Sequence, residues 1–330
     1  MKKVLIVCIG LMSLFASGCN KGNKDVIDKM KNNINNMSSY HIKGELEIIN
    51  SEDIYKYDVG VSYKEPDLFR VSLKNINNNH IQILLKNNEG VYVLTPALNK
   101  SFKFQSDWPY NNSQIYLLQT IMKDIVDDSN ASVLENGNGY IITSKVNYSN
   151  NDKLIKQKVY IDSNYNIEKV EVMDKDDVAM MKMNFNTINS RPNLSDDYFD
   201  LDSSINTSIT EEARTVSKID SIIYPMYIPD KTYLSSQDKV STTSGERIIL
   251  TFDGNNPFMF VEETSNVEKD FKTIPTNGEP EIVGDTIGVL SDNSITWSSN
   301  GVDYYVTSNT LSDKELLTVA NSINVMPVGK

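Results

Sequence analysis

The chain has 330 residues, which is long enough for two domains that each bury a core. Its formal net charge of −12 argues against a nucleic-acid-binding protein, because no basic stripe is available to displace counterions from phosphates. The excess of acidic residues favours solubility and carries no further information about function.

The N-terminus has the organisation of an export signal. Lys2-Lys3 precede an apolar run from Val4 to Phe15, and the small residues Ala16-Ser17-Gly18 lead to Cys19. A charged start, an apolar stretch and a small-residue cleavage site define a signal peptide, which we place over residues 1–18. The apolar run is shorter than the ~20 residues of a membrane-spanning helix, so an uncleaved anchor is the weaker alternative.

The end of this signal, Ser17-Gly18-Cys19, resembles a bacterial lipobox, in which the cysteine carries a diacylglycerol and becomes the first residue of the mature protein. The resemblance implies lipid attachment at Cys19 and a tether over residues 19–24. It places the protein on the outer face of the cell membrane, or, in a spore, in the forespore intermembrane space. Cys8 would leave with the signal peptide, so we expect no disulfide and no cofactor apart from the covalent lipid.

A helix and a long run of strands are predicted next. Residues 25–37 repeat apolar side chains at helical spacing. From Tyr40 to Phe104, apolar and polar residues alternate in one segment after another, separated by short loops such as Asn77-Asn78-Asn79. Short loops imply antiparallel neighbours, so we expect a sheet with one apolar face that another element must cover.

A second helix, predicted over residues 114–126, divides the strands into two groups. Hairpin turns rich in Asn, Gly and Ser separate the strands of the second group. These strands are expected over residues 131–135, 140–145, 155–161, 167–173 and 178–187.

The order helix, strands, helix, strands over residues 25–202, together with the tail Asn193 to Leu201, resembles the LolA/LolB-type lipoproteins. This resemblance implies a mainly β fold with capping helices. The expected architecture is a LolA-like unclosed antiparallel β-barrel whose concave side is capped by helices.

A polar linker over residues 203–218 and a small α+β domain over residues 219–330 are expected to follow. Two strands meet at Asn300-Gly301, and Ser312 with Glu315 has the spacing of a capping box at the start of a helix. This part resembles a C-terminal domain of exported Firmicute lipoproteins (DUF4367-like). The residues expected on the buried face of its helix are Leu316, Val319, Ala320 and Ile323.

Residues for catalysis are scarce, and we predict no enzyme and no metal site. The chain has two histidines, His41 on the polar side of a strand and His80 at a strand start, which leaves little for a catalytic triad or a three-histidine zinc site. Three acidic pairs lack the alternating spacing of a calcium loop and are interpreted as solvated turns: Asp127-Asp128, Asp176-Asp177 and Asp196-Asp197.

The apolar side of the first strands is the candidate binding face. Together, its apolar side chains form a surface large enough to line a slot for acyl chains, as the LolA-type resemblance implies. The same side chains equally suit an ordinary core that the two helices close. The residues of this face are Tyr55, Tyr57, Val59, Val61, Tyr63, Phe69, Val71 and Leu73.

Three hypotheses for function remain open. The chain resembles GerS-type germination lipoproteins of spore-forming Firmicutes, which implies a non-enzymatic lipoprotein that binds and positions a cortex-modifying N-acetylmuramoyl-L-alanine amidase or another envelope protein. The first alternative is a LolA-type carrier of lipid or lipoprotein acyl chains, and the second is a regulatory lipoprotein that senses an envelope signal. Exposed strand edges also leave a homodimer open.

Overall fold

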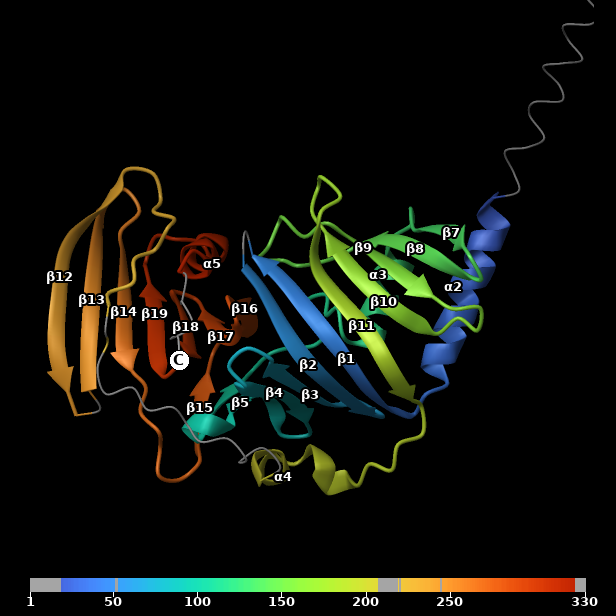
Figure 1. Cartoon of the computed structure of the whole chain (residues 1–330), viewed down its shortest axis with the longest axis horizontal. Coiled ribbons are helices and arrows are strands. Elements are labelled where there is room, and N and C mark those ends of the chain that lie inside the picture. The colour runs from blue at the N-terminus through green and yellow to red at the C-terminus, as the bar shows by residue number, and fades with distance from the viewer. Residues whose placement is uncertain (1–18, 51–52, 207–218, 220, 244, 324–330) are drawn as a thin grey trace, which may run out of the picture.

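The computed structural model describes residues 19–50, 53–206, 219, 221–243 and 245–323. The signal peptide and the part of the expected linker over residues 207–218 lie outside these ranges. Within them, no helix is both long enough and apolar enough to span a membrane. The described chain forms two β-sheets that lie side by side along the long axis of the molecule (Figure 1).

The larger sheet has twelve strands in the order β15-β6-β5-β4-β3-β2-β1-β11-β10-β9-β8-β7, and its two ends do not pair with each other. Every neighbouring pair is antiparallel except β15 and β6. The first group of strands is β1 (Ser39–Asn50), β2 (Asp53–Lys64), β3 (Leu68–Asn75), β4 (Ile81–Asn87), β5 (Gly90–Thr95) and β6 (Lys100–Phe104). The second is β7 (Ser132–Asn136), β8 (Gly139–Lys145), β9 (Lys156–Ile161), β10 (Ile167–Met173) and β11 (Ala179–Asn189).

The two groups join where β1 pairs with β11. A bulge interrupts this pair between Lys43 and Gly44, which increases the local twist. Gly44 is required there, because a Cβ atom would lie 2.2 Å from the carbonyl oxygen of Asn184. The sheet curves around its concave side as a result of such twist, without closing.

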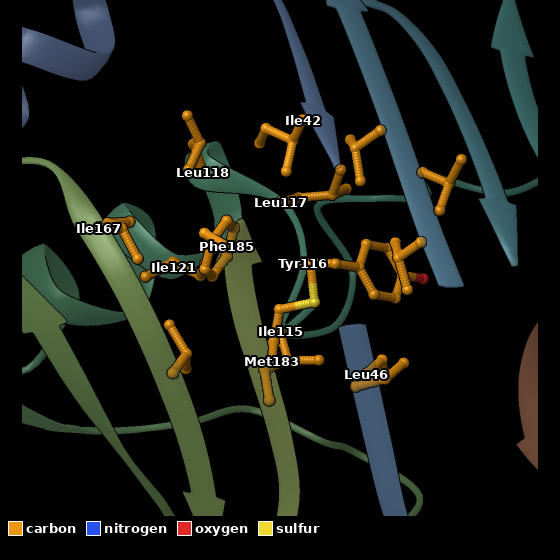
Figure 2. Close-up of a cluster of buried hydrophobic side chains, with 14 of the residues drawn as sticks. Ile42, Leu46, Ile115, Tyr116, Leu117, Leu118, Ile121, Ile167, Met183 and Phe185 are labelled. Carbon is orange, nitrogen blue, oxygen red and sulfur yellow. The ribbon is translucent and has the colours of Figure 1, made fainter. Parts of the chain in front are cut away.

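Two helices fill that concave side, α2 (Cys19–Asn35) and α3 (Leu118–Asp127). Figure 2 shows how Leu117, Leu118 and Ile121 from α3 and the loop before it pack against Ile42 of β1 and Phe185 of β11. Helix α2 adds Met30, which is completely buried in the same core. The predicted fold class, a mainly β LolA-like half-barrel with capping helices, is confirmed.

The boundaries of both helices differ from the prediction. Helix α2 begins at Cys19, so residues 19–24, expected to form an irregular tether, continue the helix. One glycine, Gly22, and no proline interrupt this stretch, and an existing helix extends easily once it has been nucleated. Helix α3 begins at Leu118, later than the expected Gln114, because Gln114 to Leu117 form a turn closed by a backbone hydrogen bond of 3.1 Å.

A short segment covers part of the convex side of the sheet. It consists of the 3-10 helix η2 (Asp196–Phe199) and helix α4 (Leu201–Asn206), so α4 occupies residues 203–206 of the expected linker. Phe199 and Ile205 form a second, smaller core with apolar residues of β4 and β5. The acidic tail seen in the sequence therefore covers apolar residues on the convex side of the half-barrel.

The second sheet has seven antiparallel strands in the order β12-β13-β14-β19-β18-β17-β16. Helix α5 (Asp313–Asn321) packs on one face, and the predicted buried residues Leu316, Val319, Ala320 and Ile323 are all buried. The strands are β12 (Thr232–Thr242), β13 (Gly245–Gly254), β14 (Phe258–Thr264), β16 (Glu279–Val283), β17 (Thr286–Ser291), β18 (Ser294–Ser299) and β19 (Val302–Thr307).

The capping box at α5 is confirmed. The Ser312 side chain accepts a hydrogen bond from the Glu315 backbone N–H, and the Glu315 carboxylate accepts one from the Ser312 backbone N–H. We expect Ser312→Ala to lower the free energy of unfolding by about 1 kcal/mol, because it leaves a first-turn N–H without its acceptor. Urea unfolding measures this, and the conservative Ser312→Thr, which keeps an acceptor, should lose less. Equal losses in both variants would contradict the capping role.

The two sheets are joined by a strand that the sequence did not predict. Strand β15 (Lys272–Thr276) comes from the C-terminal half, yet it pairs in parallel with β6 and becomes the last strand of the half-barrel. Pro275 is tolerated in it because β15 lies at the sheet edge, where a missing N–H costs no ladder bond. The next strands, β16 and β17, insert Ile282, Ile287 and Val289 into the half-barrel core.

Candidate functional site

The predicted binding face is enclosed by the protein itself. Seven of its eight residues are buried, and Val61, Phe69 and Val71 have no measurable exposure. They pack in the core that α2, α3 and the loop of residues 105–117 complete. The eighth, Tyr55, is partly buried against the same core, beside the C-terminal strands. In the described chain these side chains are thus part of the core of the half-barrel.

The aromatic residues of this face form a connected series. The rings of Tyr40 and Tyr63 lie 5.2 Å apart, those of Tyr63 and Phe69 5.0 Å, and those of Phe69 and Trp108 6.1 Å, measured between centroids. The Tyr40 hydroxyl donates to the Gln119 side chain at 2.6 Å. Tilted and edge-to-face contacts of this kind stabilise a packed interior.

A cavity of about 830 Å³ lies instead where the half-barrel meets the second sheet. This volume is within the range of pockets that bind small molecules. Its walls come from the ends of β1 and β11, the loops before α3 and β9, strands β16 and β17, and helix α5. The apolar wall residues include Ile48, Ile49, Leu84, Trp108, Leu154, Met180, Met181, Ile282, Ile287 and Leu317.

One acidic side chain, Glu281 of β16, lines the interior of this cavity. Its Oε1 accepts hydrogen bonds from the side-chain amides of Asn150 at 2.7 Å and Asn112 at 3.4 Å. Burial raises the pKa of the Glu281 carboxyl, and the negative charge of Glu279 raises it further against the two amides. Tyr148 also lines the cavity, and its buried hydroxyl has no hydrogen-bond partner within the described ranges.

Polar contacts on both sides of the cavity hold the two sheets in one arrangement. The Gln82 side chain of β4 donates to the Ile287 carbonyl at 3.0 Å and accepts from the Ile287 N–H and the Thr286 hydroxyl. At the rim, Lys314 of α5 forms an ion pair with Asp152 at 2.6 Å. The cavity is therefore a built feature of the joined sheets and not a gap between loosely placed units.

The two histidines have structural contacts. His41 lies on the convex side, where its Nδ1 is 2.9 Å from the Ser62 hydroxyl, and partial burial lowers its pKa. His80 lies between the sheets, and burial lowers its pKa while the nearby Asp285 carboxylate opposes that shift.

Only Asp176-Asp177 lies in a turn; Asp127-Asp128 ends helix α3, Asp196-Asp197 begins the 3-10 helix η2, and each pair has partners of its own. Asp128 accepts from the backbone N–H groups of Asn130 and Lys145, Asp177 pairs with Lys156, and Asp196 pairs with Lys64. Among the residues that the structure describes, no three His, Cys, Asp or Glu side chains gather as a metal site.

Several exposed apolar side chains lie on or beside the edge strand β12. Among the residues that the structure describes, fifteen large apolar side chains are exposed, and three of them, Tyr233, Leu234 and Val240, belong to β12. Tyr224 is also exposed, and its hydroxyl donates to Gln237 of β12 at 2.6 Å. We call these four residues, Tyr224, Tyr233, Leu234 and Val240, the β12 patch.

Fold and cavity define the class of this protein as a LolA-like half-barrel extended by a second sheet that is docked against it. The chain belongs to the family of the sporulation protein YdcC. It is 34% identical over 327 residues to YdcC of Bacillus subtilis (strain 168), and the match covers 98% of this chain and 97% of that protein. No protein-family model matches the chain.

Solved structures with a similar fold have low sequence identity. The MucA/MucB complex of Pseudomonas aeruginosa aligns with 91% of this chain and 98% of that chain at 11% identity and a TM-score of 0.35. A LolA superfamily protein from Nitrosomonas europaea aligns with 55% of this chain and 98% of its own chain, at 12% identity and a TM-score of 0.31. A chain from the complex of the CwlD amidase of Clostridioides difficile with the GerS lipoprotein aligns with 51% of this chain. The match covers 95% of that chain, at 18% identity and a TM-score of 0.24.

Proposed function

We propose that this protein is a non-enzymatic lipoprotein, anchored through Cys19, that binds and positions a partner during sporulation or spore germination. Membership of the YdcC family supports the link to sporulation. The likeness of its sequence to GerS-type germination lipoproteins supplies the class of partner, a cortex-modifying N-acetylmuramoyl-L-alanine amidase. The lipid anchor then holds the protein on the outer face of the cell membrane, or, in a spore, within the forespore intermembrane space.

The observation that carries this proposal is the position of the β12 patch relative to the proposed anchor. Helix α2 starts at Cys19 at one end of the long axis, and β12 lies at the opposite end (Figure 1). A lipid on Cys19 would therefore hold the patch away from the membrane. Tethering then raises the effective concentration of a bound partner near the membrane without any further contact.

Strand β12 is itself suited to receive a partner. It pairs with β13 on one side and is the last strand of its sheet on the other. Nine of its eleven residues are exposed, so its outer edge has backbone N–H and C=O groups available to an added strand. An extended segment of a partner would gain main-chain hydrogen bonds there and apolar contacts with Tyr233, Leu234 and Val240.

The acyl-carrier alternative has less support. It requires an accessible concave face, and that face is packed by α2 and α3 in the described chain. Covalent attachment at Cys19 would also keep the protein at one membrane, which does not suit a carrier that moves between membranes.

The proposal is tested with Val240→Lys, a charge placed on the exposed edge strand. We expect its dissociation constant for the purified sporulation amidase of the same organism to rise at least tenfold, because an edge lysine opposes strand addition. The matched control is Leu134→Lys, which puts the same charge on β7, the free edge strand of the other sheet, where Leu134 is 67% exposed.

Isothermal titration calorimetry or surface plasmon resonance measures the dissociation constant of both variants, and thermal melting checks that each variant is folded. An amidase that binds wild type and Val240→Lys equally well would rule out the β12 edge. An amidase that shows no binding to the wild-type protein would remove the proposed partner class.

A further inference from the structure

The cavity between the sheets has the chemistry of a site for an elongated apolar group. Ile48, Met180 and Ile282 are only partly buried by the protein and form accessible apolar wall. Leu84, Ile287 and Leu317 also line the cavity and are almost fully buried. Water gains few hydrogen bonds against such walls, so replacing it with a hydrocarbon chain is favourable.

The polar end of the cavity presents acceptors. Both amide donors that reach Glu281 are directed at Oε1, and Oε2 has no hydrogen-bond partner in the part of the chain that the structure describes. The other charged lining residues, Asp152, Lys153, Asp174 and Lys175, belong to the turns at the rim and balance one another in sign. The charged group inside the cavity is thus the Glu281 carboxyl, whose Oε2 is able to accept a hydrogen bond from a ligand.

We propose that this cavity binds an amphiphile with one hydrocarbon chain and a neutral head group that donates hydrogen bonds, such as hydroxyls, with the head at Glu281 and the chain against β1, β11 and β17. A neutral donor satisfies Oε2 without adding charge to a half-buried site.

An anionic head group is disfavoured at this place. Burying a second carboxylate beside Glu281 costs free energy, since Glu279 and Asp313 already act on Glu281 with negative charge. The cavity should therefore bind one of two ligands more tightly when they have the same hydrocarbon chain and differ only in the charge of the head group. This selectivity belongs to the joined sheets, because Glu281 and Ile282 come from β16 and the half-barrel strands supply only the other wall.

The first test needs no variant. The full mature chain is titrated with monooleoylglycerol and with sodium oleate below their aggregation concentrations, and binding is followed by native mass spectrometry and calorimetry. We expect one bound monooleoylglycerol per chain and at least tenfold weaker binding of oleate at pH 8. Equal affinities, or no saturable binding of monooleoylglycerol, would overturn the proposal.

Two variants locate the bound molecule. Met180→Trp fills the apolar part and should weaken monooleoylglycerol binding at least tenfold, whereas Met259→Trp, at an exposed position of β14, should leave it unchanged. Glu281→Gln should keep its carbonyl oxygen toward Asn112 and Asn150 and turn its NH₂ group into the cavity.

This exchange of an acceptor for a donor should weaken monooleoylglycerol about tenfold and strengthen oleate several-fold. Glu135→Gln, an exposed change on β7, serves as its control. An unchanged preference in Glu281→Gln, or an effect of Met259→Trp as large as that of Met180→Trp, would place the ligand elsewhere and refute the site.

Discussion

Replacing Gln82 with methionine is expected to lower the free energy of unfolding by about 3–5 kcal/mol. The Gln82 side chain is 5% exposed and makes three hydrogen bonds to Thr286 and Ile287 of β17. Methionine has a similar volume, so it leaves little empty space but strands a buried N–H, a carbonyl and a hydroxyl, each of which costs about 1–3 kcal/mol unless water reaches it.

Urea unfolding of the mature chain measures this loss, and Gln105→Met, at an exposed position, is the matched control. Gln82→Ala adds a cavity and should be at least as destabilising as Gln82→Met. A Gln82→Met protein that unfolds at the wild-type urea concentration would show that the junction of the two sheets does not depend on this amide.

Raising the pH from 5 to 8 is expected to destabilise the wild-type protein relative to Glu262→Gln by about 2 kcal/mol. Glu262 of β14 is 1% exposed, and burial raises the pKa of its carboxyl to about 7, although a hydrogen bond from the Ile223 N–H opposes the shift. In the unfolded chain the same carboxyl loses its proton near its ordinary value of 4.5.

The sign of this effect follows from proton binding. Between those two pKa values the folded protein retains a proton that the unfolded chain has released, so rising pH favours the unfolded chain. The full shift from 4.5 to about 7 would correspond to about 3.4 kcal/mol, and the limited pH interval together with partial solvent screening reduces it to about 2 kcal/mol. Glutamine keeps an acceptor for Ile223 and cannot ionise, so the variant should lack this part of the pH dependence.

The measurement is urea unfolding of wild type, Glu262→Gln and the exposed control Glu168→Gln at pH 5 and pH 8. Buried Asp124, whose pKa burial raises to about 6, titrates alike in all three proteins and cancels in the difference. If the free energy of unfolding changed equally with pH in wild type and Glu262→Gln, a buried Glu262 with a raised pKa would be contradicted.

The segment that Glu262 holds connects this effect to the β12 patch. Ile223 donates to Glu262, and Ile219 donates to Glu246 of β13 at 3.1 Å, so two carboxylates fix the chain that crosses the second sheet. Tyr224 of the patch and then Met226 follow directly, and the Met226 N–H donates to the Ser322 carbonyl. Variants at Glu262 therefore also need a check that partner binding is unchanged.

Local patterns in the sequence predicted most of the half-barrel. Strands β1, β2 and β3 were visible because one side of each is more buried than the other, which gives their sequence a period of two. The capping box of α5 was visible because Ser312 and Glu315 act on each other within one turn. Strand β12 was missed for the opposite reason, since exposure on both faces leaves no alternation to detect.

The candidate site could not be read in the same way. The binding face predicted from Tyr55 to Leu73 has the pattern of an apolar surface, and the pattern is identical whether a ligand or the protein's own helices cover it. The cavity residues are spread from Ile48 to Ser322, so no short window of sequence contains the site. Glu281 was indistinguishable from any other acidic residue on a half-exposed strand.

By itself, the sequence determined the two sets of strands, the covering helices and an expected lipid attachment at Cys19, because each depends on residues close together in the chain. Only the tertiary structure decided that β15 pairs with β6, that β17 contributes to both cores, and that Gln82 and Glu281 face across the junction. These contacts join residues well over one hundred positions apart. They arise from the closure of long loops and the fit of two whole surfaces, and neither leaves a periodic signal in the chain.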